Sequence, residues 1–180
     1  MKKRRVMAAL AAALAIGGGV WLVSREKKPG GGAASENRPV LNTTHEKVFL
    51  AEQLRRNPTH PPILLRLAQI ERGEGNLRGA REHLEQAVVA EGKQVEIRLE
   101  LGLVCGEMGD MAAAEEQNRE VLRIEPGQPD ALYNLGAIAA NRGDVQSARA
   151  FWTEAVRRGR NSDAVEKSRQ AIARLQAVAR

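Results

Sequence analysis

The sequence repeats itself at a fixed interval, and this repetition constrains the fold more than any other feature. Three copies of equal length follow one another without a gap, at residues 61–94, 95–128 and 129–162. The aligned columns hold residues of matching size: Leu67, Leu101 and Leu135; Ala68, Gly102 and Gly136; Gly75, Gly109 and Gly143; Ala80, Ala114 and Ala148; Ala87, Val121 and Ala155. Self-similarity at such a period is typical of solenoids that stack one repeated supersecondary unit.

Each copy contains two stretches with helical periodicity. In the first copy, apolar residues recur at helical spacing in the first half and again in the second half, namely Leu64, Leu67, Ala68 and Ile70, then Leu77, Ala80, Leu84, Ala87 and Val88. This pattern predicts two amphipathic helices of about three turns each. Small residues in the second and fourth columns would let the two helix backbones approach closely.

A glycine followed by Asn or Asp separates the two stretches in every copy: Gly75-Asn76, Gly109-Asp110 and Gly143-Asp144. Glycine can adopt the left-handed conformation that ends a helix. The Asn or Asp side chain can accept a hydrogen bond from the first turn of the next helix. Pro129 likewise suits the first turn of a helix. The sequence therefore predicts a helical hairpin in each copy.

These residues resemble the tetratricopeptide repeat (TPR) family. In the third copy the positions of large, small and glycine residues follow the family pattern, at Leu132, Leu135, Gly136, Gly143, Ala148, Trp152 and Ala155. The resemblance covers the three copies, which make up more than half of the chain. Asn118 departs from it, because Leu84 and Trp152 occupy that column elsewhere, and Gly92 and Arg160 replace the closing proline that Pro126 supplies. The resemblance implies an all-α fold, a right-handed α-solenoid of three tandem hairpins.

Flanking helices are expected at both ends of a TPR domain that spans residues 44–180. Residues 44–56 resemble the second helix of an incomplete leading repeat, with Val48, Phe49 and Leu54 predicted to be buried. Residues 163–179 form a weakly apolar stripe at Ser168, Ala171, Ile172, Leu175 and Ala179, opposite the polar residues Lys167, Arg169, Gln170 and Arg174. Such a helix would cap the solenoid with one solvated face.

The segment 1–24 is predicted to be a signal-anchor that forms a transmembrane helix. Positions 6–23 carry no charged side chain, and they are preceded by four basic side chains and followed by three. As a helix this run would span about 27 Å, close to the hydrocarbon thickness of a bilayer. The alternative is a cleavable signal peptide with a cleavage site before Gly18, which would release a soluble exported protein. The segment 25–43, rich in glycine, is predicted to be a flexible linker.

The charge distribution argues against nucleic acid as a partner. The formal net charge is +6, but seven of the 28 basic side chains and one of the 22 acidic side chains fall within positions 1–28. The rest of the chain therefore carries equal numbers of basic and acidic side chains. A neutral body lacks the basic surface that a phosphate backbone requires. The slight excess of basic residues before the apolar run predicts a single-pass protein of the cytoplasmic membrane with its body in the periplasm.

No catalytic, cofactor or metal site is predicted, and no small-molecule substrate. The three histidines, His45, His60 and His83, show no metal-ligand or catalytic spacing. Cys105 falls on the apolar side of its predicted helix, where a small buried hydrophobe is needed. A single cysteine also excludes an intramolecular disulfide. An enzyme that uses His83 or Cys105 is the alternative from another class.

The TPR resemblance implies that the first helices of the repeats line a concave face that binds extended peptides or partner helices. The columns that carry over to this face are Leu65, Arg66, Gln69, Arg72, Glu96, Leu99, Glu100, Leu103, Asp130, Tyr133, Asn134 and Asn141. Family members that clamp an acidic C-terminal peptide carry lysine and arginine here with two asparagines, and only Asn134 matches them. Glu96, Glu100 and Asp130 favour a basic partner peptide; the alternative is an ordinary solvated acidic patch.

These features predict a membrane-anchored scaffold that mediates protein–protein interactions at a bacterial cell envelope. The alternative within the same fold is a permanent assembly subunit of an envelope machine for secretion, pilus formation or cytochrome c maturation. Binding that survives solubilisation at low concentration would distinguish permanent docking from transient recruitment.

Overall fold

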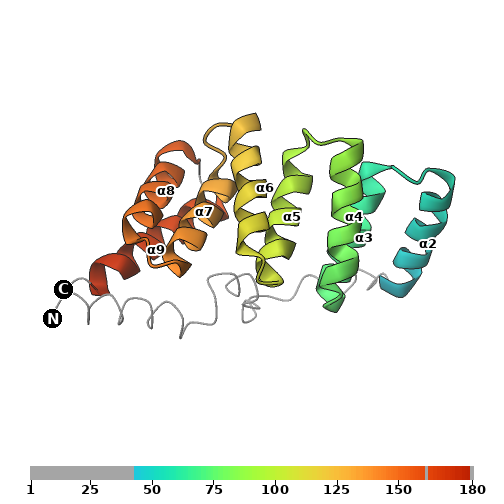
Figure 1. Cartoon of the computed structure of the whole chain (residues 1–180), viewed down its shortest axis with the longest axis horizontal. Coiled ribbons are helices and arrows are strands. Elements are labelled where there is room, and N and C mark those ends of the chain that lie inside the picture. The colour runs from blue at the N-terminus through green and yellow to red at the C-terminus, as the bar shows by residue number, and fades with distance from the viewer. Residues whose placement is uncertain (1–42, 161, 179–180) are drawn as a thin grey trace, which may run out of the picture.

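The structure, a computed structural model, describes residues 43–160 and 162–178, which fold into eight helices and no strand. The helices stand side by side in a row (Figure 1). In chain order they are α2 (Thr43–Arg56), α3 (Pro61–Glu74), α4 (Leu77–Ala90), α5 (Val95–Glu107), α6 (Met111–Ile124), α7 (Pro129–Asn141), α8 (Val145–Arg158) and α9 (Asp163–Val178). The predicted all-helical solenoid is therefore confirmed for this part of the chain.

The predicted signal-anchor lies outside the described residues, and so does the predicted linker apart from Thr43. Within residues 43–160 and 162–178, no helix combines the length and the apolar character that a membrane span needs.

The turns inside the three hairpins are built as the glycine and Asx pattern predicts. Gly75, Gly109 and Gly143 have φ angles of +84°, +84° and +79°. Each following Asn or Asp side chain accepts a hydrogen bond from a backbone N–H in the first turn of the next helix, at 3.2, 3.1 and 3.0 Å. The left-handed glycine ends the first helix, and the side-chain cap begins the second.

Close contact inside the third hairpin depends on the absence of a side chain at Gly136. A Cβ atom at Gly136 would lie 2.3 Å from Nε1 of Trp152. Trp152 is 1% exposed, and its Nε1 donates a hydrogen bond to the Tyr133 carbonyl at 3.0 Å. The indole fills the space between α7 and α8, and its only polar atom is satisfied.

In the second hairpin, Asn118 takes the place of a large apolar residue and is fully buried. Its Nδ2 donates to the Ala114 carbonyl at 2.7 Å, and its Oδ1 accepts from Nδ2 of Asn134 at 3.0 Å. Gly102 leaves room for it, because a Cβ there would lie 2.8 Å from the Asn118 amide. The departure from the family pattern is thus accommodated by a polar link between α6 and α7.

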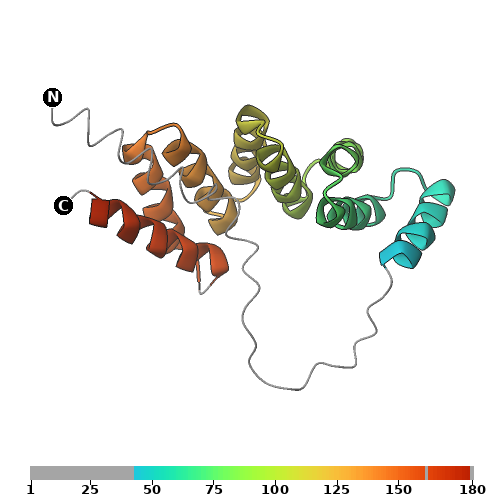
Figure 2. The same ribbon diagram turned by 90° about the horizontal axis from the view of Figure 1, so that it is seen from below.

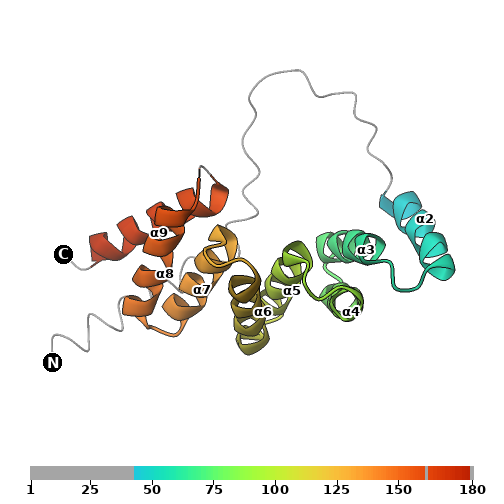
Figure 3. The same ribbon diagram turned by 90° about the horizontal axis from the view of Figure 1, so that it is seen from above.

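At the C-terminal end, α9 is part of the core. It packs against α8 and α7 (Figure 3). Its buried residues are Ala164, Val165, Ser168 and Leu175. Ser168 Oγ donates to the Ala164 carbonyl at 2.7 Å, so the one polar member of this set is satisfied. Because α9 begins exactly one repeat length after α7, it occupies the place of the first helix of a fourth repeat.

At the N-terminal end, α2 buries no side chain completely. Val48 and Phe49 are 66% and 62% exposed, so the prediction that they are buried is wrong. The physical reason is that α2 stands at the end of the row (Figure 2), where one side of the helix has a neighbour. Only Leu54 among the three predicted residues packs against the hydrophobic core.

Ion pairs connect α2 to α3. Lys47 Nζ lies 2.8 Å from Glu74 and 3.3 Å from Glu71. Arg66 binds the Glu46 carboxylate through two hydrogen bonds of 2.6 and 2.9 Å. The N-terminal helix is therefore held largely by charge.

Candidate functional site

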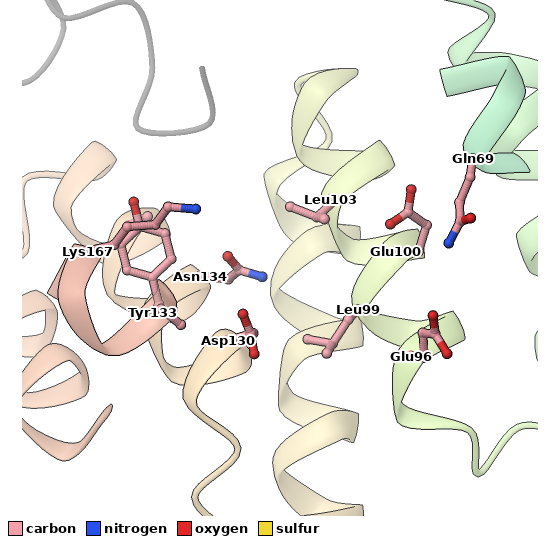
Figure 4. A pocket seen from close by; sticks show the side chains of 11 residues that line it. Gln69, Glu96, Leu99, Glu100, Leu103, Asp130, Tyr133, Asn134 and Lys167 are labelled. Carbon is pink, nitrogen blue, oxygen red and sulfur yellow. The ribbon is translucent and has the colours of Figure 1, made fainter. Parts of the chain in front are cut away.

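A groove of about 230 Å³ lies over α5, α7 and α9, and α3 contributes Gln69 to it (Figure 4). It is lined by side chains from the first helix of each repeat and from the terminal helix: Gln69, Glu96, Leu99, Glu100, Leu103, Asp130, Tyr133, Asn134, Ala137, Ala164 and Lys167. The groove exists because each hairpin presents its first helix on the same side of the row.

Eight of the twelve residues predicted to line a peptide groove are brought together here: Gln69, Glu96, Leu99, Glu100, Leu103, Asp130, Tyr133 and Asn134. The other four do not line it. Leu65 is 8% exposed and belongs to the core. Arg66 is paired with Glu46, and Arg72 is paired with two glutamates of α5. Asn141 is exposed at the end of α7.

Sequence reasoning missed Ala137, Ala164 and Lys167. Lys167 follows Tyr133 by one repeat length, and Tyr133 follows Leu99 by the same interval. The core columns of the repeat do not continue into α9, because Arg169 and Gln170 stand one repeat length after Leu135 and Gly136. If only the groove columns are extended into the first helix of a further copy, they predict Lys167 as a groove residue.

The groove offers apolar surface at two places. Leu99 and Leu103 on α5 lie near its middle, and Tyr133 on α7 lies toward the α9 end, with Asn134 and Asp130 between them (Figure 4). Burial raises the pKa of Tyr133, so the phenol is neutral near pH 7. The two leucines and the neutral aromatic ring offer surface for apolar side chains of a ligand.

Three acidic side chains line the groove: Glu96 and Glu100 lie toward its α3 end, and Asp130 lies between the leucines and Tyr133 (Figure 4). One of the three is already paired. Arg72 Nε lies 2.7 Å from Glu100, and its Nη1 lies 3.0 Å from Glu107. The Glu100 side chain is only 12% exposed. Glu96 and Asp130 make no ion pair within the described residues, and Asp130 accepts a hydrogen bond from Gln128 at 3.1 Å. The uncompensated negative charge of the groove therefore comes from two residues, Glu96 and Asp130.

A basic side chain lies at the opposite end. Lys167 Nζ lies 2.6 Å from Oδ2 of Asp163, one helical turn earlier on α9. The Asp163 side chain is 81% exposed, whereas that of Lys167 is 24% exposed. The ammonium group therefore stands at the edge of the groove with a solvated partner.

The residues considered for catalysis lie elsewhere. His83 Nδ1 lies 2.9 Å from Glu71, which also pairs with Lys47. Cys105 is 1% exposed, and burial raises the pKa of its thiol, which keeps it protonated. Neither residue lines the groove. Within residues 43–160 and 162–178, no group of three or more His, Cys, Asp or Glu side chains could hold a metal ion.

A row of helical hairpins with a groove along their first helices defines a helical-repeat scaffold. The family model described as tetratricopeptide repeat matches residues 65–129 and 106–164, which together make more than half of the chain. The chain belongs to the tetratricopeptide repeat family.

Solved structures show the same fold. The crystal structure of MamA matches with a TM-score of 0.60 and 20% identity, over 64% of this chain and 67% of that chain. YrrB, a TPR protein with an unusual peptide-binding site, matches with a TM-score of 0.63 and 20% identity, over 71% of this chain and 66% of that chain. At this level of identity the likeness concerns the fold alone.

Two curated relatives share part of the sequence. The probable biofilm formation methyltransferase WspC of Pseudomonas putida is 40% identical over 63 residues, which is 35% of this chain and 15% of that protein. WspC of Pseudomonas aeruginosa is 35% identical over 89 residues, 49% of this chain and 21% of that protein. The chain thus spans about a fifth or less of these relatives. The family model and the structural likenesses agree on a helical-repeat fold.

Proposed function

We propose that this protein is a membrane-anchored TPR scaffold of a bacterial cell envelope whose groove binds an extended segment of another protein. The observation that carries the proposal is the groove itself, in which the partly exposed side chains of Leu99, Leu103 and Tyr133 offer an apolar surface. Apolar surface in a groove with polar groups around it is the usual form of a binding site. TPR proteins bind other proteins or peptides, and YrrB has a peptide-binding site.

The acidic residues favour a partner segment that carries a basic side chain. Glu96 and Asp130 stand in the same column of successive repeats and both line the groove. Glu100 attracts a basic side chain less strongly than an unpaired carboxylate would, because it already forms an ion pair with Arg72. Basic side chains of the partner are therefore expected to contact Glu96 or Asp130.

Site-specific crosslinking in intact cells tests the binding proposal. A photo-reactive amino acid at Leu99 should capture a protein, and the same group at Val89 should not, since Val89 is 89% exposed but does not line the groove. Adding Leu103→Arg should abolish the Leu99 product. Equal capture at both positions, or a product that survives Leu103→Arg, would contradict a role for the groove.

The anchor is proposed from the sequence of the N-terminal segment 1–28, where the uncharged run 6–23 lies between basic flanks. The full chain should stay with the membrane fraction after alkaline extraction and should leave it when this run is deleted. A reporter fused after Arg180 that is active only in the periplasm should give signal. Release by alkali, or activity of a cytoplasmic reporter instead, would exclude this arrangement.

A further inference from the structure

The charge of the groove changes sign along the row of helices. One column of the repeats supplies Glu96, Asp130 and Ala164, and a second supplies Leu99, Tyr133 and Lys167. In Figure 4, Glu96 and Glu100 lie toward one end, Lys167 and Tyr133 lie toward the other, and Leu99 and Leu103 lie between them, with Asp130 and Asn134 between the leucines and Tyr133. A segment laid along the groove therefore passes from acidic side chains to a basic one.

The two unpaired carboxylates of the groove stand on different helices. Glu96 is in the first turn of α5, and Asp130 is in the first turn of α7. No ion pair within the described part of the chain engages either carboxylate. Because Leu99 lies between them in Figure 4, only Glu96 belongs to the end that lies opposite Lys167, and a cationic side chain placed over Glu96 displaces no internal partner.

The basic end is available for exchange. The partner of Lys167 is Asp163 on the same helix, and the Asp163 side chain is 81% exposed. An ion pair of this kind is weak, because water competes for the exposed carboxylate. A carboxylate of a ligand that is partly shielded by Tyr133 could replace Asp163 at the ammonium group. The hydrogen bond to Asn118 holds the Asn134 side chain in place in the groove.

We infer that the partner segment is bipolar: a basic side chain lies over Glu96, apolar side chains lie over Leu99 and Leu103, and a carboxylate binds Lys167. This inference rests on the proposed function and specifies its ligand. A uniformly basic segment would place a cation against Lys167, and a uniformly acidic one would oppose Glu96 and Asp130. Either arrangement brings like charges together, which selects against it.

Selection from a library of random linear peptides displayed on phage tests the inference with the full-length chain in detergent. The parent protein should enrich peptides that carry a basic and an acidic residue on opposite sides of apolar residues. Enrichment of uniformly basic peptides that is lost with Leu103→Arg would overturn the bipolar ligand and leave the proposed function intact. Enrichment that is unaffected by Leu103→Arg, or no enrichment, would overturn the proposed function itself.

Charge changes at the basic end supply the second test. For a synthetic peptide of the enriched sequence, Lys167→Glu should raise Kd about tenfold or more, and Lys167→Gln should raise it less. Changing the acidic residue of the peptide to lysine should restore binding to Lys167→Glu. The matched control is Arg169→Glu, an exposed cation of α9 outside the groove. An equal loss with Arg169→Glu, or no rescue by the reversed peptide, would overturn the inference.

Discussion

The two ends of the solenoid are closed by different forces. At the C-terminal end, α9 buries Ala164, Val165 and Leu175 to 2% exposure or less. At the N-terminal end, α2 buries no side chain completely and is joined to α3 by the ion pairs of Glu46 and Lys47. Apolar burial is not weakened by salt, whereas ion pairs near the surface are screened by it. The two ends should therefore loosen under different conditions.

The register of the repeats shows where α2 differs from the other second helices. It begins one repeat length before α4, so its residues fall into the same columns as those of α4, α6 and α8. Glu46 stands where Ala80, Ala114 and Ala148 allow close approach, and Gln53 stands in the column of Ala87. Polar residues thus replace the small buried residues in these columns, and Glu46 binds Arg66 of α3 instead.

The largest expected effect is at the apolar end. Leu175→Ala should lower the free energy of unfolding by about 2–5 kcal/mol, because it removes a buried leucine side chain. Urea denaturation of the full chain, followed by circular dichroism, measures this loss. The matched change at the other end, Leu54→Ala, should cost less than half as much, since Leu54 is only partly buried. Equal losses of unfolding free energy in the two variants would contradict the difference between the two ends.

A smaller loss is expected at the junction between α8 and α9. A Cβ atom at Gly159 would lie 2.1 Å from Cγ2 of Val165, 2.9 Å from the Ala155 carbonyl and 3.0 Å from the Pro129 ring. Gly159→Val should therefore displace α9 and lower stability by about 1–3 kcal/mol, as overpacking does. Gly73→Ala is the control, because nothing lies within 4 Å of that Cβ position. A neutral Gly159→Val would show that α9 is docked loosely.

At the charged end, Lys47→Met should loosen α2 by about 1 kcal/mol, since it leaves Glu71, which is 6% exposed, with one ion-pair partner fewer. Hydrogen exchange of the α2 amides should speed up, while exchange in α9 stays unchanged. High salt should speed up exchange in α2 of the parent protein in the same way. Exchange in α2 that does not respond to salt would show that charge does not hold this helix.

The smallest effect is a pH dependence of the docking of α2. The hydrogen bonds from Arg66 lower the pKa of Glu46 below its ordinary value of 4.5. A carboxylate with a lowered folded pKa stabilises the folded state above its unfolded pKa, and this contribution is lost as the pH falls through the folded value. Docking of α2 should therefore weaken only below about pH 4.5. Glu46→Gln should remove this dependence from α2 exchange; a dependence that persists would assign it to another group.

The sequence predicted the hairpins because their determinants are local. The glycine and Asx pair at Gly75 and Asn76 encodes the turn by itself, and the same kind of pair recurs twice. The burial of Trp152 against Gly136 was also foreseeable, since both columns are visible in the alignment of the copies. Contacts that follow from a fixed repeat register can be read directly from such an alignment.

Other contacts depend on which neighbours a helix has, and the sequence does not state this. Val48 and Phe49 look like core residues, but within residues 43–160 and 162–178 no helix lies against the outer side of α2 to cover them. The pairing of Arg72 with Glu100 and Glu107 joins two repeats through long side chains whose direction the columns do not fix. The columns therefore present Glu100 as free charge. The apolar stripe of residues 163–179 predicts Lys167 on a solvated face, although the groove columns, continued into this helix, include it.

The amide link between Asn118 and Asn134 makes the repeats distinct modules and not interchangeable copies. The side-chain partner of Asn118 is Asn134 of the next repeat, which stands in the same column as Glu100 of the second repeat. A tandem duplication of the second repeat would set Glu100 opposite Asn118 at the new junction, in place of an amide. Lengthening this array by gene duplication at that point would thus require a compensating substitution, and the order of the second and third repeats is encoded in their own interior.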